Sequence, residues 1–459
     1  MQVKQEASFG YRLIAPIALG SMLNPINSTM IATALVPIAR DFQASVAQTG
    51  WLIAALYLTS AIAQPTMGRL ADRFGPRRVY LICLMLVAIA GLLGAVMSSL
   101  TGLVCVRVLL GIGTSGAYPA AMRIFRVQAD RLRGEPPRSA MGLLSMGGTA
   151  TLAIGPFLGG VLTSTFGWHA IFLVNAPFAL AIIALVLLWV PRDEQASRDS
   201  RHLLDAVDVL GIAIFTAFLL SLMTFLLKLD HPNWFALVAA VFFCAGLVKH
   251  SLKRSRPFID VRMLTANRAL RMTYLRAGAM LMMVYCILYG FAQWLESAAG
   301  FSEQRAGLIT MPMSIVAALT SFAGTRPGRV RTPFLISIGS GIVGCLCLLM
   351  IDSATDAWLI AVAVIGFAAP QGMFSTATQT AVYMQARTED IGTAAGLQRT
   401  AQYLGAIAAT SLLGLTYGQH ATDQGLHRLA LIMGVLGAVL LVWTLSDRTL
   451  RYSASQQTP

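Results

Sequence analysis

The strongest constraint on the fold is a series of apolar runs, each about 20 residues long, separated by short polar loops. A run of that length crosses the hydrocarbon core of a bilayer as an α-helix, because unpaired backbone groups are too costly in lipid. Hydrophobic residues make up 56% of the 459 residues and charged residues 12%. A soluble domain carries about 25% charged residues. The sequence therefore predicts an all-α polytopic membrane protein.

Fourteen transmembrane helices are predicted from the positions of these runs. Their approximate ranges are 12–37, 49–68, 79–99, 101–122, 139–163, 168–190, 207–227, 233–250, 272–294, 305–324, 333–351, 357–380, 393–416 and 427–446. Charged stretches at 191–205 and 250–270 divide them into groups of six, two and six. We therefore expect an N-terminal six-helix bundle at 1–190, an inserted two-helix hairpin with cytoplasmic linkers at 191–267, and a C-terminal six-helix bundle at 268–459.

The distribution of lysine and arginine predicts the orientation. With the N-terminus inside, the outer loops hold only Arg40, Lys228, Arg305 and Arg428, while nearly all the other basic residues lie at the cytoplasmic side. An excess of lysine and arginine in the cytoplasmic loops sets the orientation of multi-pass membrane proteins. We expect a multi-pass protein of the cell inner (plasma) membrane with both termini in the cytoplasm. The net charge of +14 is spread over short loops, which argues against a nucleic-acid-binding face.

A dense polar loop connects the second and third spans. Residues 68–78 hold one acid, two glycines, one proline and four arginines. A plain positive-inside loop would explain the arginines, but it requires neither the acid nor the glycines. We therefore interpret the loop as a gate element, formed by Gly68, Asp72, Arg73, Gly75, Arg77 and Arg78.

The fifth span carries a second glycine pattern. Small residues four positions apart let membrane helices approach closely, and a proline removes one backbone donor and bends the helix. The pattern consists of Gly147, Gly148, Gly155, Pro156, Gly159 and Gly160. Generic helix packing is the alternative interpretation.

Together these motifs resemble the major facilitator superfamily and, within it, the 14-helix drug:proton antiporters. The loop matches the family pattern G-x-L-a-D-R-x-G-r-r, and 155–160 matches the glycine–proline motif of family exporters. Family-like stretches also occur at 167–177, 208–211 and 256–260, so the resemblance covers essentially the whole chain. It implies a secondary active transporter in which Asp72 latches the cytoplasmic side against the helix that begins near 392–394. It further implies that the glycine face of span five packs on the opposite bundle and biases the cycle toward export.

Arg107 lies within the fourth span. A charged side chain in a bilayer costs ~2.5 kcal/mol or more on insertion scales, so it should face a cavity or a partner. The resemblance implies a role in coupling or substrate binding. Snorkelling to the outer interface is the alternative.

The sequence departs from the family pattern at three positions. Asn27 stands where many relatives carry an aspartate that binds a proton or cation, and an amide cannot titrate. Glu296 replaces the usual glutamine and is either the proton carrier or a solvated loop residue. Arg399 lies within span thirteen, where relatives often have asparagine. Further candidate lining residues are Tyr118, Tyr285, Tyr289, Trp294, Gln371, Gln379, Tyr403, Met280, Met282 and Met283.

The departures indicate a central cavity with more arginine than carboxylate, which would repel a lipophilic cation unless Glu296 faces it. We therefore predict proton-coupled efflux of a small amphipathic, neutral or anionic compound. A metabolite symporter or uniporter is the alternative if Asn27 means that no proton site exists, and a membrane sensor or enzyme is a remote one.

The sequence holds no nucleotide-binding loop or nucleophile elbow, and its histidines are scattered. We expect no enzymatic activity, no cofactor and no metal. The expected partners are the substrate, protons and the lipid bilayer. A monomer is expected, with periplasmic accessory proteins as candidate partners and no nucleic acid.

Overall fold

The computed structural model describes residues 10–132, 151, 154–193, 208–226, 232–254, 257–259, 261–321, 330–386, 391–447 and 450. Within these ranges every regular element is a helix. The first ones are α1 (Tyr11–Ser21), α2 (Leu23–Met30), η1 (Ile31–Ala34), α3 (Leu35–Asp41), α4 (Val46–Phe74), α5 (Pro76–Val96), α6 (Leu100–Ser115), α7 (Ala117–Arg131), a helix at Ile154–Phe166, α9 (Ala170–Leu173) and α10 (Asn175–Trp189).

The helices that follow continue the same pattern. They are α12 (Val209–Leu226), α13 (Trp234–Lys253), α14 (Val261–Ala266), α15 (Arg268–Tyr285), η3 (Cys286–Phe291), α16 (Ala292–Ser297), α17 (Glu303–Ser321), α18 (Arg331–Leu348), α19 (Ala357–Val364), η5 (Ile365–Phe367), α20 (Ala368–Gln371), α21 (Met373–Gln385), α22 (Ile391–Tyr417) and α23 (Asp423–Ser446).

Eleven helical stretches in the described ranges are long and apolar enough to cross a membrane. Each of the other three predicted spans also coincides with a helix. The one at Ile154–Phe166 is shorter than a bilayer requires, and the start of the predicted span 139–163 lies outside the described residues. The remaining two are α17 and α22. The chain is thus an all-helical membrane protein with 11 to 14 candidate spans, and the count of fourteen stays a prediction.

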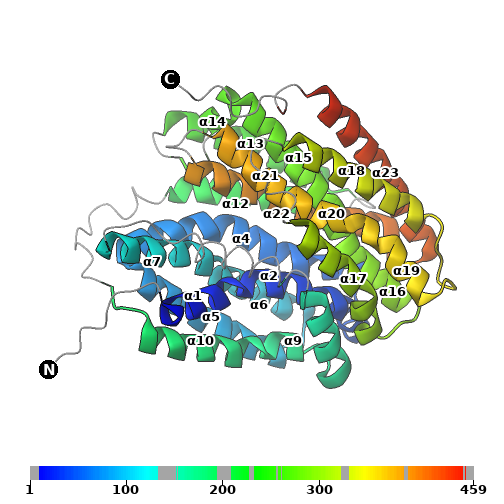
Figure 1. Cartoon of the computed structure of the whole chain (residues 1–459), viewed down its shortest axis with the longest axis horizontal. Coiled ribbons are helices and arrows are strands. Elements are labelled where there is room, and N and C mark those ends of the chain that lie inside the picture. Colours follow the sequence, from blue (N-terminus) through cyan, green and yellow to red (C-terminus); the bar gives the residue numbers. More distant parts are fainter. Residues whose placement is uncertain are drawn as a thin grey trace.

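The helices form two groups that lie against each other (Figure 1). We call α1 to α10 the N-terminal half and α15 to α23 the C-terminal half. Helices α4 and α22 contact each other across the boundary, and α12 of the hairpin contacts both of them. The residue boundaries of the three predicted parts stay a prediction.

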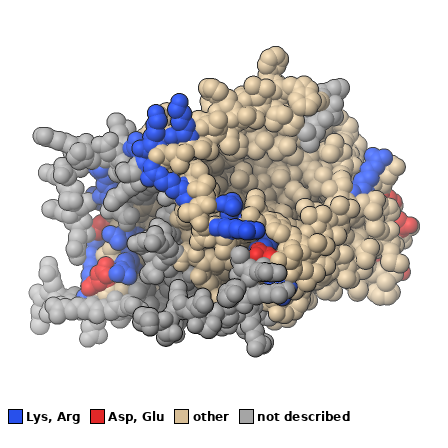
Figure 2. Space-filling model, turned by 90° about the horizontal axis from the view of Figure 1, so that it is seen from above, with Lys and Arg blue, Asp and Glu red and all other residues tan. Residues whose placement is uncertain are grey.

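One end of the bundle is basic. Figure 2 shows most of the visible lysine and arginine side chains toward the left, the side on which α7 and α14 lie in Figure 1. We call this the basic end, at which α4 ends and α5 begins, and we call the other the opposite end. By the positive-inside rule the basic end should be cytoplasmic.

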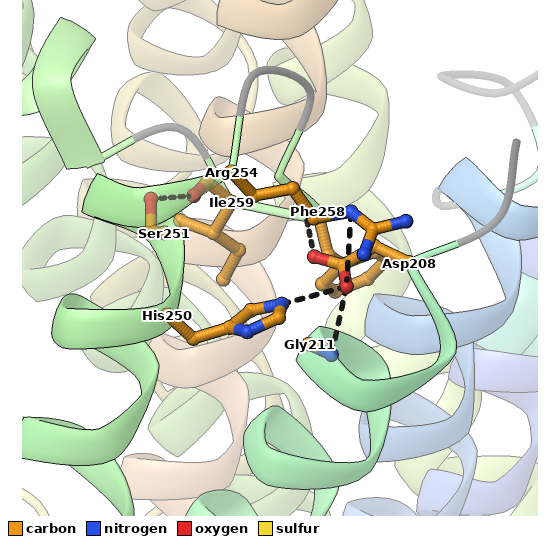
Figure 3. Close-up of polar contacts among 7 residues, drawn as sticks. All are labelled: Asp208, Gly211, His250, Ser251, Arg254, Phe258 and Ile259. Carbon is orange, nitrogen blue, oxygen red and sulfur yellow. Dashed lines mark hydrogen bonds and ion pairs between the residues drawn. The ribbon is translucent and has the colours of Figure 1, made fainter. Parts of the chain in front are cut away.

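A buried carboxylate closes the base of the hairpin formed by α12 and α13 (Figure 3). Asp208 is 1% exposed. Its Oδ1 accepts a hydrogen bond from the backbone N–H of Gly211 at 3.0 Å and lies 2.7 Å from Nε2 of His250. Its Oδ2 accepts from the backbone N–H of Phe258 at 2.9 Å, and Nε of Arg254 lies 3.7 Å from Oδ1. One side chain therefore joins the start of α12, the end of α13 and the segment that follows.

Replacing Asp208 by alanine is expected to lower the thermal unfolding midpoint by several degrees. Two backbone N–H groups would lose their acceptor, at ~1–3 kcal/mol for each one left buried. Burial opposes ionisation, but the hydrogen bonds outweigh it and hold the pKa of Asp208 below its ordinary value. The stabilisation should therefore exist at neutral pH and be lost as the pH falls through that lowered pKa. Thermal unfolding in detergent measures this, and alanine at the exposed Asp356 is the control. Equal midpoints for the two variants would contradict the prediction.

Candidate functional site

Arg107 is buried inside the N-terminal half, at 1% exposure. Its Nε donates a hydrogen bond to the backbone oxygen of Leu52 at 2.8 Å, and its Nη1 donates to the backbone oxygen of Asn27 at 3.0 Å. Its Nη2 has no partner among the described residues, and none of their carboxylates pairs with it. The side chain therefore does not snorkel. Within the described part of the chain, its positive charge has no ion-pair partner and its Nη2 group has no acceptor.

The Asn27 side chain is held in an amide pair. Its Nδ2 donates to Oδ1 of Asn175 at 2.5 Å, and Nδ2 of Asn175 donates to its Oδ1 at 2.9 Å. Both side chains are buried, and the pair links α2 to α10. Asn27 thus contributes its backbone oxygen to Arg107 and its amide to helix packing.

A pair of tyrosine hydroxyls joins the two halves near Arg107. The hydroxyl of Tyr289 donates to the backbone oxygen of Ser28 at 2.7 Å, and the hydroxyl of Tyr57 lies 2.8 Å from that of Tyr289. Ser28 directly follows the residue whose carbonyl accepts from Arg107. The guanidinium and this polar bridge between the halves therefore lie in one region of the molecule.

The tyrosine pair belongs to a larger aromatic cluster. The ring of Tyr57 lies 5.2 Å from that of Tyr285 and 5.5 Å from that of Tyr403, between ring centroids. The hydroxyl of Tyr403 donates to Oε1 of Gln64 on α4 at 3.1 Å. The cluster combines apolar faces with hydroxyl groups, which suits an amphipathic ligand.

The backbone around Tyr289 departs from a regular α-helix. Residues Cys286–Phe291 form the single π-helical turn η3 between α15 and α16. Such turns are rare and occur frequently at functional sites. In this chain the turn carries Tyr289, the residue that reaches across to the N-terminal half.

Glycine lets the two halves meet at a second place. A Cβ atom added at Gly160 would collide with the backbone oxygen of Glu303 at the start of α17. Reciprocally, a Cβ added at Gly307 on α17 would lie 3.0 Å from the backbone oxygen of Pro156. Gly155 and Gly159 pack instead on residues 29–33 of their own half. Gly147 and Gly148 lie outside the described residues.

The predicted gate loop at 68–78 is not a loop: it is the end of α4 and the start of α5, joined at Gly75. The start of α5 is bound by an acid that the sequence analysis did not single out. The carboxylate of Asp193 accepts hydrogen bonds from the backbone N–H groups of Arg77 at 3.1 Å and Arg78 at 3.0 Å, at the start of α5. Gly75 makes the turn before this helix with φ of 95°, a conformation that favours glycine. Nη2 of Arg77 donates to the backbone oxygen of Leu187 near the end of α10, at 3.2 Å.

The predicted latch involves side chains that the structure does not describe. The side chain of Asp72 and those of residues 391–393 lie outside what the structure describes. Gly68 packs without a clash beside Pro119, at 3.5 Å from an added Cβ. The interaction of Asp72 with the start of α22 stays a prediction.

The remaining two predicted cavity residues, Glu296 and Arg399, lie in different parts of the C-terminal half. Glu296 is at the opposite end on α16, and its side chain is buried rather than solvated as in a loop. Arg399 on α22 is exposed, and its Nη1 lies 3.3 Å from Oε1 of Gln402. The structure therefore brings Asn27 and Arg107 together and places Glu296 at the opposite end. Arg399 lies near the tyrosine cluster, because its charge acts on Tyr285 and Tyr403.

The candidate lining residues also separate into groups. Tyr285, Tyr289 and Tyr403 belong to the tyrosine cluster. Trp294 instead donates from Nε1 to Oδ1 of Asp423 at 2.8 Å, an anchor between α16 and α23. The sequence analysis did not select Tyr57. Its hydroxyl group, which lies inside an apolar run, could have marked it as a candidate lining residue. The remaining candidate lining residues differ in burial. Exposed are Tyr118 and Gln379, half-buried is Met282, and buried are Gln371, Met280 and Met283.

Comparison with known proteins adds independent information. The sequence model described as Major Facilitator Superfamily matches residues 17–410. The chain is 30% identical over 450 residues to the uncharacterised MFS-type transporter YwoD of Bacillus subtilis (strain 168), covering 96% of this chain and 98% of that protein. It is 27% identical over 432 residues to the tetracenomycin C resistance and export protein of Streptomyces glaucescens, covering 89% and 76%.

A solved structure shares the fold. The inward open conformation of the xylose transporter XylE from E. coli is similar with a TM-score of 0.66, over 98% of both chains. The identity is 14%, so this likeness concerns the fold alone.

Proposed function

The chain belongs to the Major Facilitator Superfamily, a family of transporters rather than enzymes, and we propose on this premise that it exports a small amphipathic, neutral or anionic compound in exchange for protons. Efflux is supported by the relative that is named for tetracenomycin C resistance and export. It is also supported by the resemblance of residues 155–160 to the motif of family exporters.

The observation that carries the substrate class is the environment of Arg107. The guanidinium is buried, has a free Nη2 donor and makes no ion pair with a described carboxylate. In a low-dielectric interior such a charge favours an anion or a strong hydrogen-bond acceptor and repels a cation. The tyrosine cluster beside it offers apolar ring faces for the remainder of an amphipathic molecule.

Alternating access would use contact regions between the halves, two of which are described above. The Gly160–Glu303 approach and the Tyr57–Tyr289–Ser28 bridge join the halves in the described conformation. In our proposal both separate when the opposite end opens, while Asp72 latches the basic end. The basic end faces the cytoplasm in this proposal, and the protein lies in the plasma membrane.

Transport by the purified full chain in proteoliposomes tests the proposal. Under an imposed pH gradient we expect accumulation of an anionic dye such as fluorescein, accompanied by substrate-induced proton release, and little accumulation of the cation ethidium. Selective transport of ethidium would contradict the substrate class. Counterflow that ignores the pH gradient would favour the uniporter alternative.

A further inference from the structure

We propose that Glu296 binds the coupling proton and exchanges it with the outside through a cavity between the two halves at the opposite end of the bundle. This inference rests on the proposed proton-coupled export and names the group that carries the proton. It moves the titrating site away from Asn27, which cannot titrate, to α16 at the opposite end, where the C-terminal half meets the N-terminal half.

The burial of Glu296 carries the proposal. The residue is 4% exposed, and neither Oε1 nor Oε2 has a hydrogen-bond partner among the described residues. Burying a carboxylate without a donor costs several kcal/mol or more, whereas a neutral carboxylic acid costs roughly what a hydroxyl or amide does. The conformation described here therefore suits the protonated form. Glu296 makes no bond that would explain it as a structural acid.

Other acids in the described part of the chain differ in this respect. Each has a donor or an ion pair, which gives it a structural role. They are Asp41 with Trp168, Asp130 with Arg126, Asp193 with the start of α5, Asp208 with His250, Asp352 with Thr355, Asp423 with Trp294, and Asp447 with Arg276. Among the described carboxylates, Glu296 is the buried one left without such a partner.

A route to the outside lies next to Glu296. A cavity of about 440 Å³ is bounded on the N-terminal side by residues of α3 and the start of α4, and on the other by α16 and the α22–α23 connection. Gln293 and Ser297, which flank Glu296 along the helix, are in its wall. Its full lining is Val36, Ala39, Arg40, Val46, Gln293, Ser297, Ala298, Gln419, His420, Ala421, Thr422 and Asp423. A small rearrangement of α16 would bring the carboxyl into this cavity.

The charged groups around Glu296 come from several elements. Helix α16 contacts α3, η1 and α17. Arg40 on α3 is an opposite charge that would favour the ionised form, and Glu303 at the start of α17 is a like charge that would oppose it. His420 and Asp423 face the cavity, and Asp423 is already bonded to Trp294 and Ser353. Arg40 is thus the counter-charge available to the deprotonated carboxylate.

The proposed step is a proton transfer alone. With the opposite end open, outside water gives a proton to the carboxylate of Glu296, which becomes neutral and loses its interaction with Arg40. Closure then buries the neutral acid, as described here. When the basic end opens, water that enters between the separated halves from that end takes the proton from Glu296, and the carboxylate forms again.

Glu296→Gln tests this step, because the amide keeps the size of the side chain but cannot titrate. In infrared difference spectra between low and high pH, we expect a carboxylic acid C=O band in the wild type that is missing from Glu296→Gln. In proteoliposomes with anionic fluorescein, a gradient of one pH unit should give up to about tenfold accumulation in the wild type. The variant should show accumulation no greater than without a gradient, while its counterflow stays within about twofold.

Two further variants serve as references. Asp356→Asn neutralises an exposed acid near the same end and should leave spectra and gradient-driven transport unchanged. Glu296→Asp keeps a carboxyl group and should restore part of the coupling, which a purely structural role would not predict. Gradient-driven accumulation by Glu296→Gln at the wild-type level would overturn the proposal. A wild type without gradient-driven transport would instead overturn the proposed function, and the infrared band would then decide whether Glu296 binds a proton.

Discussion

Replacing Arg107 by leucine should reduce export of an anionic dye by about 100-fold or more. The side chain makes two charge-assisted hydrogen bonds, to the carbonyls of Leu52 and Asn27, and such bonds contribute ~1.5–3 kcal/mol each. Its loss also removes the free Nη2 donor that we assign to the substrate. Transport of fluorescein in proteoliposomes, divided by the amount of folded protein, measures the effect.

Further variants and a neutral dye distinguish a substrate-binding role of Arg107 from a purely structural one. Arg107→Lys keeps the charge but not the fork of donors, so it should retain part of the transport with weaker binding of the anion. Arg428→Leu, which removes an exposed arginine at the opposite end, is the matched control and should transport like the wild type. Equal losses for a neutral and an anionic dye would indicate a purely structural Arg107. Wild-type rates in Arg107→Leu would contradict both roles.

The sequence was sufficient for features that depend on local physics. Apolar runs of bilayer length predict helices because lipid leaves the backbone no other way to satisfy its hydrogen bonds. Within the described residues, each predicted span coincides with a helix. The cost of a buried charge predicts that Arg107 points inward, and it does. The family resemblance, based on the loop and span-five motifs, is confirmed by the family match over residues 17–410.

Features that depend on distant pairing could not be predicted in this way. Nothing near Tyr57 in the sequence indicates that its hydroxyl lies 2.8 Å from that of Tyr289 on the other half. The acid that caps α5 is Asp193, which follows the sixth span and carries no local signal of that contact. From the sequence alone, a solvated loop residue was an equal alternative for Glu296. The packing of α16 against α3 and α17 shows that the residue is buried.

The positions of Asn27 and Glu296 in the fold therefore change the roles that we assign to these two residues. Asn27 stands where the resemblance implies a titrating aspartate, yet the structure gives its amide a packing role with Asn175. The N-terminal half retains Arg107 in the same region, without a described carboxylate beside it. In our proposals, substrate recognition stays with this arginine and proton binding moves to Glu296. The two functions would then be coupled by the movement of the halves rather than by direct contact.

That movement makes Gly160 the second position at which a large effect is expected. Gly160→Val should lower the export rate by roughly 5- to 150-fold, the change that corresponds to about 1–3 kcal/mol of overpacking. Even a Cβ atom at this position would collide with the backbone oxygen of Glu303, and a backbone cannot move aside as a flexible side chain does. In our proposal, the substitution therefore penalises the conformation described here, in which Gly160 lies against Glu303, relative to one in which the two residues have separated.

A matched control exists in the other half. Gly339 on α18 has no atom within 4 Å of an added Cβ, so Gly339→Val makes the same chemical change without a collision. We expect it to transport within about twofold of the wild type. Both variants should reach the membrane in similar amounts, measured by size-exclusion chromatography of a fluorescent fusion. Equal export by the two variants would mean that the Gly160–Glu303 approach does not limit the cycle. A selective loss in Gly160→Val would identify closure of this interface as a required step of transport.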